Sequence, residues 1–121
     1  MQIQWQSDQP IYRQLRERMV QMILDGLLAE GEALPGVRKV AAELQLNPLT
    51  VMKGYQELVE EQIVEKKRGL GMFVREGARE QLLANERERF LSEDWPRILA
   101  RIELLGLRRE SLLADMGGNG R

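Results

Sequence analysis

The stretch "LQLNPLTVMKGYQEL", from Leu44 to Leu58, contains the start of a predicted helix. Several side chains near that start are expected to be exposed to solvent, and packing in a core does not account for them. Asn47 is a good helix cap, and Pro48 suits the first helical position, where no backbone N–H is needed. The helix is expected to run to about Gln62. Its buried stripe, by helical spacing, is Val51, Tyr55, Leu58 and Val59. Three side chains near the helix start are left facing outward: Leu49, Thr50 and Lys53.

The segments on either side of this helix predict a winged helix-turn-helix. A shorter helix is expected from Val37 to Leu44, followed by a tight turn at Gln45 and Leu46, and this spacing is typical of a helix-turn-helix. After the second helix, "IVEKKRGLGMFVRE" (residues 63–76) has two short β-prone runs around the tip "KKRGLG" (residues 66–71), which predicts a β-hairpin. A hairpin in this place is a wing.

The remaining sequence predicts one further helix before this motif and a helical tail after it. The first helix is expected from about Pro10 to Leu28, with Leu27 on its buried face. In the tail, "SED" (residues 92–94) is expected to restart the chain, and Gly106 to end a helix in a left-handed cap. The fold class is therefore mainly α with a small β-hairpin. We expect a winged helix-turn-helix domain over residues 1–76 and a helical tail over residues 77–121.

The composition gives little support to enzyme chemistry. The chain has 121 residues with no histidine and no cysteine, so disulfides, thiolate chemistry and the usual metal ligands are missing. Its carboxylates are scattered among basic residues at helical spacings, which is typical of solvated helix faces. We expect no enzyme activity, no cofactor and no metal. The sequence also lacks a signal peptide or a long apolar run, so we expect a cytoplasmic protein without a membrane partner.

The outward side chains of the helix that begins at Asn47 fit double-stranded DNA as a partner. The second helix of a helix-turn-helix lies in the major groove, with its first residues at the base edges. There Leu49 could pack on a thymine methyl, Thr50 could bond a base edge or a phosphate, and Lys53 could reach guanine or a phosphate. Asn47 and the free N–H groups beside it suit a phosphate. The alternative is an ordinary exposed surface, with Thr50 part of the local cap or packed against the preceding helix.

Basic residues outside this helix could add contacts with the DNA backbone and grooves. Arg38 lies at the start of its helix, where a cation opposes the helix dipole, so an external phosphate is the favoured partner over a surface pair with Glu43 or Glu32. In the hairpin, Lys66, Lys67 and Arg68 precede Gly69, and glycine allows close approach of a backbone to a groove. A solvated hairpin tip is the alternative.

These motifs resemble the winged-helix domain of the GntR family of bacterial transcription regulators. The matching segments lie between Asp8 and Val74, in order: "PIYRQL", "G-x-L…LP-x-x-R", "VAAELQLNPLTV", "GYQELVEEQIV" and "G-x-G-x-F-V". The resemblance implies that six residues occupy DNA-contacting positions: Arg38, Asn47, Leu49, Thr50, Lys53 and Gly69. The chain departs from the family pattern at Gly36, where serine is usual, and at Gln62, where glycine usually ends the recognition helix.

The tail of about forty residues is too short to enclose a typical ligand pocket, and it resembles the short-tailed, YtrA-type branch of the family. That branch implies a homodimer and regulation of neighbouring transport genes. The sequence independently favours dimerisation, because the tail carries much apolar surface, although these residues could instead fold back on Trp5 and the first helix. The candidate dimerisation residues are Leu82, Leu83, Phe90, Leu91, Trp95, Ile98, Leu99, Ile102 and Leu105.

The sequence thus predicts a homodimeric repressor that binds a palindromic operator. Two other functions stay open. A winged helix that has lost DNA binding could use its tail to bind a protein partner. A sensor could hold a small-molecule effector, still unidentified, between the tail and the winged domain.

Overall fold

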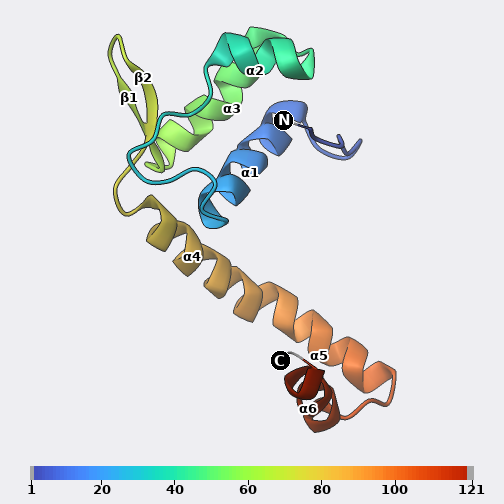
Figure 1. Ribbon diagram of the computed structural model, residues 1–121. Helices are drawn as coiled ribbons and strands as arrows, with labels where there is room; N and C mark the ends of the chain where they lie inside the picture. Colours follow the sequence, from blue (N-terminus) through green and yellow to red (C-terminus); the bar gives the residue numbers. More distant parts are fainter. Residues whose placement is uncertain (1, 120–121) are drawn as a thin grey trace. The chain divides into compact units, whose positions relative to one another are not determined.

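The computed structural model describes residues 2–119, with side chains described for residues 2–114, and it forms two compact units, Met1–Leu83 and Ala84–Arg121. The first unit contains three helices, α1 (Ile11–Leu24), α2 (Val37–Leu44) and α3 (Pro48–Glu60), and a hairpin of two strands (Figure 1). The predicted bounds of α2 are confirmed. The turn after α2 places Gln45 in the left-handed region, with φ 56°. The described fold of the first unit is a winged helix-turn-helix.

Helix α1 ends at Leu24, so the predicted end at Leu28 is wrong. Gly26 adopts φ 82° and the chain folds back, with the Leu28 N–H donating to the Met22 carbonyl at 3.1 Å. Leu28 is buried, whereas Leu27, which was expected to face the core, is 66% exposed. The apolar pattern of the sequence continues past the end of α1 because Leu28, in the loop that follows, also packs in the core.

The wing consists of β1 (Val64–Lys67) and β2 (Gly71–Val74), paired antiparallel with Val64 opposite Val74 and Lys66 opposite Met72. The loop after α1 runs along the free edge of β2. The Gly31 N–H donates to the Val74 carbonyl and the Leu34 N–H to the Met72 carbonyl, both at 2.8 Å. This loop therefore adds a third backbone to the wing, which the sequence did not predict.

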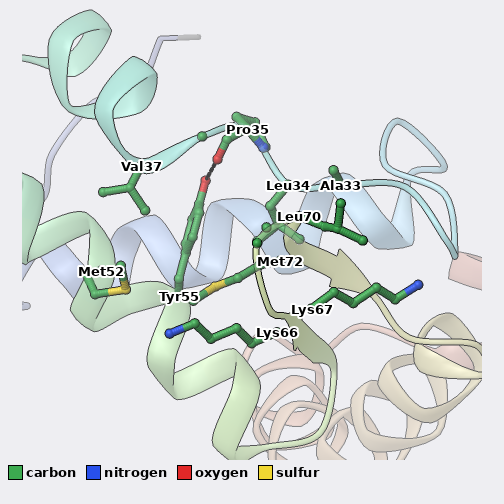
Figure 2. Close-up of a pocket in the computed structure, with 13 residues that line it drawn as sticks. Ala33, Leu34, Pro35, Val37, Met52, Tyr55, Lys66, Lys67, Leu70 and Met72 are labelled. Carbon is green, nitrogen blue, oxygen red and sulfur yellow. Dashed lines mark hydrogen bonds between the residues drawn. The ribbon is translucent and has the colours of Figure 1, made fainter.

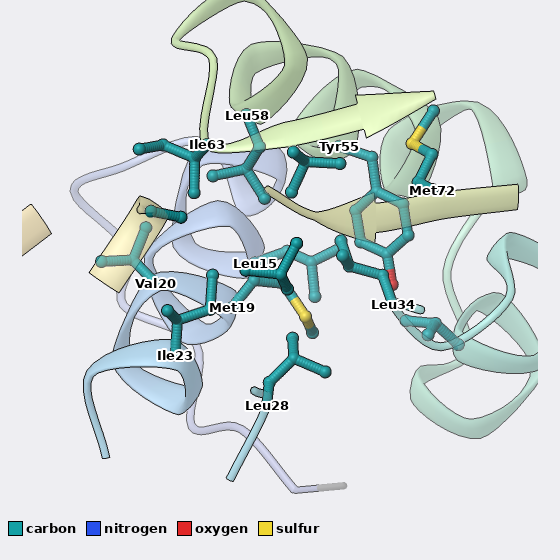
Figure 3. Close-up of a cluster of buried hydrophobic side chains, with 14 of the residues drawn as sticks. Leu15, Met19, Val20, Ile23, Leu28, Leu34, Tyr55, Leu58, Ile63 and Met72 are labelled. Carbon is teal, nitrogen blue, oxygen red and sulfur yellow. The ribbon is translucent and has the colours of Figure 1, made fainter. Parts of the chain in front are cut away.

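The core of the first unit joins all three helices, α1, α2 and α3, with the wing and the start of α4 (Ala78–Arg89), and part of it is drawn in Figure 3. Its most buried large side chains include Leu15, Met19, Ile23, Tyr55, Leu58 and Ile63. Burial of one such side chain stabilises the fold by about 1.5–3 kcal/mol. The Tyr55 hydroxyl donates to the Pro35 carbonyl at 2.7 Å, and burial raises the pKa of Tyr55 well above its ordinary value. Tyr55 thereby ties α3 to the loop that leads into α2.

Helices α1 and α3 meet through a glycine. A Cβ atom at Gly54 would lie 2.8 Å from the Tyr12 carbonyl oxygen, closer than packed atoms approach. Because that oxygen belongs to the backbone, no side-chain rotation could make room. Gly54 therefore sets how closely the two helices pack.

A buried amide holds the N-terminal segment. The Gln14 side chain is 9% exposed and forms three hydrogen bonds with that segment. Its Oε1 accepts from the Gln6 N–H at 2.7 Å, and its Nε2 donates to the carbonyls of Gln6 and Gln9, both at 2.8 Å. Ile3 packs against the core. The fold thus begins before α1.

Two charged side chains attach the start of α4 to the rest of the first unit. The Glu30 carboxylate accepts from the Arg79 N–H at 3.1 Å, and backbone hydrogen bonds from Gly77 and Arg79 lower the pKa of Glu30. The Arg79 guanidinium donates to the Leu24 carbonyl, at the end of α1, at 3.0 and 3.1 Å. Each charge lies at the helix end that its sign favours. Ala78 and Leu82 are buried in the core beside them.

The second unit contains the remainder of α4, a π-helical turn (Phe90–Asp94), α5 (Trp95–Leu104) and α6 (Arg109–Asn119). The predicted break at "SED" is wrong, because the Trp95 N–H donates to the Phe90 carbonyl five residues back and helical structure continues. The predicted left-handed cap at Gly106 is confirmed, with φ 70°. The Leu107 N–H closes this cap on the Ile102 carbonyl at 3.0 Å.

The second unit has no core of its own among the side chains that are described. None from Ala84 to Ala114 is buried. The exposed large apolar side chains there are Phe90, Leu91, Ile98, Leu104, Leu105, Leu107 and Leu113. Helices that leave so much apolar surface uncovered are marginal in water on their own.

Candidate nucleic-acid interface

One concave surface of the first unit borders parts of three regions that were predicted to contact DNA, although among the predicted residues only Lys66, Lys67 and Gly69 line it. A hollow of about 450 Å³ lies between the loop before α2, the middle of α3 and the tip of the wing (Figure 2). Tyr55 and Met72 contribute to its lining, together with Met52 from the exposed side of α3. Gly36, two residues before Arg38, lies on one side of the hollow, and Lys66 and Gly69 lie on the other. We call this surface the concave face.

The start of α3 has the predicted geometry. The Asn47 side chain accepts from the Leu49 N–H at 2.9 Å, so Asn47 is confirmed as the helix cap. Leu49 is 76% exposed, as predicted, while Thr50 is half-buried. An exposed leucine beside a capped helix start can reach the methyl group of a thymine in a major groove.

Lys53 is exposed but does not extend freely from α3. Its Nζ lies 4.2 Å from the centroid of the Tyr12 ring, and Tyr12 is the second residue of α1. Arg13 lies beside the same ring, with its Cζ 5.9 Å from the centroid. No pattern in the sequence predicts this contact, since the two partners are far apart along the chain.

The wing separates the lysines that the sequence grouped together. Lys66 is on the strand face that includes Met72 and extends toward α3, whereas Lys67 extends the opposite way, its Nζ 4.7 Å from the Phe73 ring centroid (Figure 2). Alternation along a strand places neighbours on opposite faces. Arg68 and Gly69 form the exposed turn, where Gly69 has φ 77°. Both lysines therefore contribute to the lining of the hollow, but only Lys66 extends toward α3 (Figure 2).

Arg38 is exposed in the first turn of α2. Gly36 is the N-cap of this helix and supplies no side-chain hydrogen bond to it. The serine that is usual at this position in the family could have bonded to the first N–H groups, so the departure leaves the start of α2 without a side-chain cap. Backbone N–H groups near Arg38 are consequently free to meet an anion.

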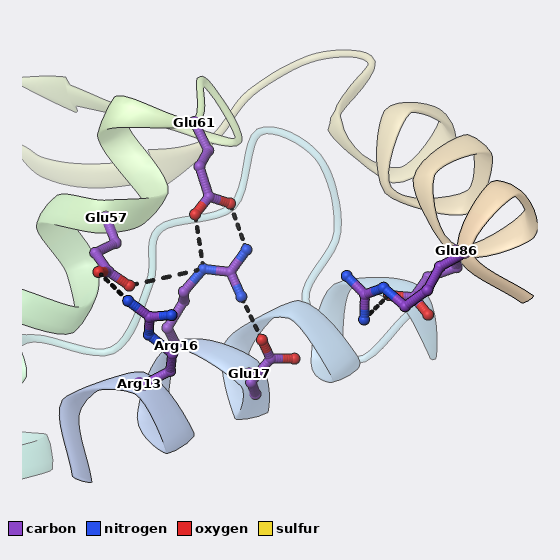
Figure 4. Close-up of polar contacts among 7 residues, drawn as sticks. Arg13, Arg16, Glu17, Glu57, Glu61 and Glu86 are labelled. Carbon is purple, nitrogen blue, oxygen red and sulfur yellow. Dashed lines mark hydrogen bonds and ion pairs between the residues drawn. The ribbon is translucent and has the colours of Figure 1, made fainter. Parts of the chain in front are cut away.

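Acidic residues on the later turns of α3 are paired with arginines of α1 (Figure 4). Arg13 lies 3.4 Å from Glu57, and the Arg16 Nε donates to Glu61 at 2.8 Å. The bond to Glu61 raises the pKa of Arg16 above its ordinary value. The negative charge on this part of α3 is thus largely balanced within the fold, which reduces its repulsion of phosphates.

Two further α3 residues share the exposed face with Leu49. Met52 is 38% exposed and Gln56 is exposed, at three and seven residues from Leu49. Their spacing along a helix is the signal that could have identified them. The exposed tip residue Leu70 was missed too, at 73% exposure.

The candidate dimerisation residues divide between the two units. Leu82 is 5% exposed in the core of the first unit, so its side chain is not available to a second copy, and this part of the prediction needs correction. The candidates from Phe90 onward belong to the second unit and are exposed or half-buried. The rings of Phe90 and Trp95 stack with centroids 6.3 Å apart.

Within residues 2–119, no helix is both long and apolar enough to cross a membrane. The same part of the chain has no cluster of three or more acidic residues arranged to hold a metal ion.

A winged helix-turn-helix whose recognition helix and wing border one concave face defines a class of DNA-binding proteins. Comparison with known sequences identifies the family: residues 11–74 match the profile described as bacterial regulatory proteins, gntR family. The chain belongs to the GntR family and is a DNA-binding transcriptional regulator, not an enzyme.

Individual relatives agree with this assignment. The chain is 40% identical over 83 residues to the HTH-type transcriptional repressor YtrA of Bacillus subtilis, covering 69% of this chain and 64% of that protein. It is 31% identical over 110 residues to the uncharacterized HTH-type transcriptional regulator YhcF of the same organism, covering 91% and 89%. Among solved structures, a GntR family transcriptional regulator from Listeria monocytogenes matches with a TM-score of 0.74 at 29% identity, over 94% of this chain and 98% of that one.

Proposed function

We propose that this protein is a homodimeric, cytoplasmic repressor that binds a palindromic operator through the concave face. The observation that supports the proposal is that the loop leading into α2, the middle of α3 and the tip of the wing surround one hollow, which Met52, Lys66 and Gly69 help to line. Leu49, Thr50 and Met52 would meet base edges, while Arg38, Lys66 and Arg68 would meet phosphates and the neighbouring groove. Repression is proposed because YtrA, the relative at 40% identity, is a repressor. Transport genes are the proposed targets, from the family resemblance.

The second unit supports a dimer. Its described side chains include no buried residue, and seven large apolar ones are exposed, so association would supply the missing core. An apolar groove of about 450 Å³ between α5 and α6, lined by Trp95, Ile98, Ile102 and Leu113 among others, suits apolar side chains of a second copy. Two copies would carry two recognition helices, as a palindrome requires.

The test is binding to a duplex from the region upstream of the protein's own gene, measured by fluorescence anisotropy at several salt concentrations. A scrambled duplex of equal length serves as competitor. We expect tight binding that weakens with salt and that the scrambled duplex does not compete away at equal concentration. Binding that does not distinguish the duplexes would contradict sequence-specific recognition.

A matched pair of variants tests the concave face. Lys66→Ala removes the wing cation that extends toward α3, and Lys67→Ala removes its neighbour, which lies on the opposite strand face and extends the other way (Figure 2). We expect Lys66→Ala to lower the salt slope of log K by about 1, the contribution of one phosphate contact, and Lys67→Ala to change it much less. Equal effects of the two variants would mean that the wing meets DNA in another orientation.

A further inference from the structure

The contact between Tyr12 of α1 and Lys53 of α3 bears on what Lys53 does in the regulator. The Lys53 ammonium lies 4.2 Å from the Tyr12 ring centroid, a distance typical of a cation–π contact. Such a contact restricts a flexible side chain that would otherwise occupy many rotamers. Lys53 forms no ion pair with a described residue, so its charge remains available to an outside anion.

The surroundings of Lys53 favour a phosphate over a base as its partner. The ring draws the ammonium toward the start of α1, where Arg13 adds a second cation beside the same ring. Arg13 is shared with Glu57 at 3.4 Å, whereas Lys53 has no such partner among the described residues. A cation held against a neighbouring helix is poorly placed to reach guanine acceptors in the groove floor. It is well placed for the DNA backbone that borders the groove.

We propose that Tyr12 is a positioning residue that holds Lys53 as a contact with the DNA backbone, at a second anchor point formed by α1 and α3. The aromatic face, not the hydroxyl, performs this role. The inference rests on the proposed DNA-binding function and assigns Lys53 to affinity, leaving sequence discrimination to other side chains of α3, such as Leu49, Thr50 and Met52.

The experiment is a double-mutant cycle on the full-length chain, with Lys53→Ala, Tyr12→Leu, the double variant and Tyr12→Phe. Each protein is titrated with the upstream duplex and with the scrambled duplex over a series of salt concentrations. Thermal unfolding of each variant is recorded alongside, so that a folding defect is recognised.

We expect Lys53→Ala to weaken binding to both duplexes by a similar factor and to lower the salt slope by about 1. Tyr12→Leu should weaken binding roughly two- to fivefold, the size expected from an exposed cation–π contact, while Tyr12→Phe stays near the wild type. In the Lys53→Ala background, Tyr12→Leu should have little further effect, because its target is gone.

Three results with the variants would overturn the inference. If Lys53→Ala weakened only the upstream duplex, Lys53 would be a base reader. If the effects of Tyr12→Leu and Lys53→Ala multiplied, Tyr12 would act independently of Lys53. If Tyr12→Phe were as weak as Tyr12→Leu, the hydroxyl would carry the role. Failure of the proposed function has a separate signature, a wild-type protein that does not prefer the upstream duplex, and the cycle can still be read on the scrambled one. A wild type that binds neither duplex would overturn both.

Discussion

At the scale of single residues, Gly54 controls the contact between α1 and α3. We expect Gly54→Ala to destabilise the fold by about 1–3 kcal/mol, the usual cost of overpacking, because the added Cβ would lie 2.8 Å from the Tyr12 carbonyl oxygen. Urea denaturation would measure the change. The same substitution at Gly36, where a Cβ would meet nothing within 4 Å, is the control for overpacking and should cost only the weaker N-cap preference of alanine. Equal effects at the two positions would show that the helices can separate without cost.

Gln62 is a second residue at which the backbone constrains the side chain. It adopts φ 64°, a left-handed conformation that is unfavourable for a residue with a Cβ. Here the chain departs from the family's usual glycine yet keeps the conformation that glycine favours. We expect Gln62→Gly to stabilise the fold by about 0.5–1 kcal/mol.

Gln56→Gly provides the opposite case, because Gln56 lies inside α3. Glycine in an exposed helix interior should destabilise by about 1 kcal/mol. Thermal unfolding of the two variants should therefore shift in opposite directions. A lower melting temperature for both would mean that the Gln62 side chain makes a contribution larger than its backbone strain.

Residue-scale predictions from sequence succeeded where the signal was local. Asn47 was identified as a cap and Leu49 as exposed because cap chemistry and helical spacing involve only neighbouring residues. The position of Lys53 over Tyr12 depends on how α1 and α3 pack, and no pattern within either helix encodes that contact. The roles of the contact residues on DNA remain predictions.

At the scale of elements, the attachment of α4 to the first unit should depend on pH. Backbone hydrogen bonds lower the pKa of Glu30 in the folded state, so the ionised carboxylate favours folding. A lowered pKa contributes stability that is complete above the unfolded value, about 4.3 for glutamate, and is lost as pH falls through the folded value. We expect Glu30→Gln to be less stable than the wild type at pH 7, with the difference shrinking below about pH 4.

Urea denaturation of both proteins at pH 7 and at pH 3 would measure this difference. Glu60→Gln, at an exposed position on α3, controls for the loss of one negative charge. A gap between wild type and Glu30→Gln that stayed constant down to pH 3 would show that the carboxylate charge does not stabilise α4.

Elements were predictable when their ends carried clear signals. The bounds of α2, the start of α3 and the hairpin follow from cap residues, proline and glycine. The end of α1 was misplaced because Leu27 and Leu28 continue the helical pattern after the helix has stopped. The break at "SED" was wrong because a π-helical turn absorbs the polar residues without interrupting the helix. The loop after α1, which pairs with the edge of β2, has no alternation of apolar and polar residues that would have predicted this pairing.

At the scale of the whole molecule, the apolar surface of the second unit predicts the assembly state. We expect Ile98→Glu to dissociate the proposed dimer, because it would place a charge in the apolar groove between α5 and α6. Sedimentation equilibrium would measure the mass. Ala100→Glu adds the same charge at an exposed position of α5 outside that groove and should leave the dimer intact.

Binding of the Ile98→Glu protein to two DNA sites distinguishes a defect in dimer formation from a defect in DNA recognition. A monomeric Ile98→Glu protein should lose affinity for a palindrome but keep its affinity for a half-site, since the winged domain is untouched. A wild-type protein that sediments as a monomer would contradict the dimer and would leave the groove as a candidate site for a small molecule or a protein partner.

The three hydrogen bonds between the Gln14 side chain and the N-terminal segment have a consequence for where this domain can be shortened. The family match starts at residue 11, which invites a shortened chain that begins there. Such a chain would remove all three hydrogen bonds of the Gln14 amide to Gln6 and Gln9, and their replacement by water would cost about 0.5–1.5 kcal/mol for each bond. It would also uncover the core beside Ile3. The boundary drawn by sequence similarity therefore leaves out residues that the fold uses, among them Ile3, Gln6 and Gln9.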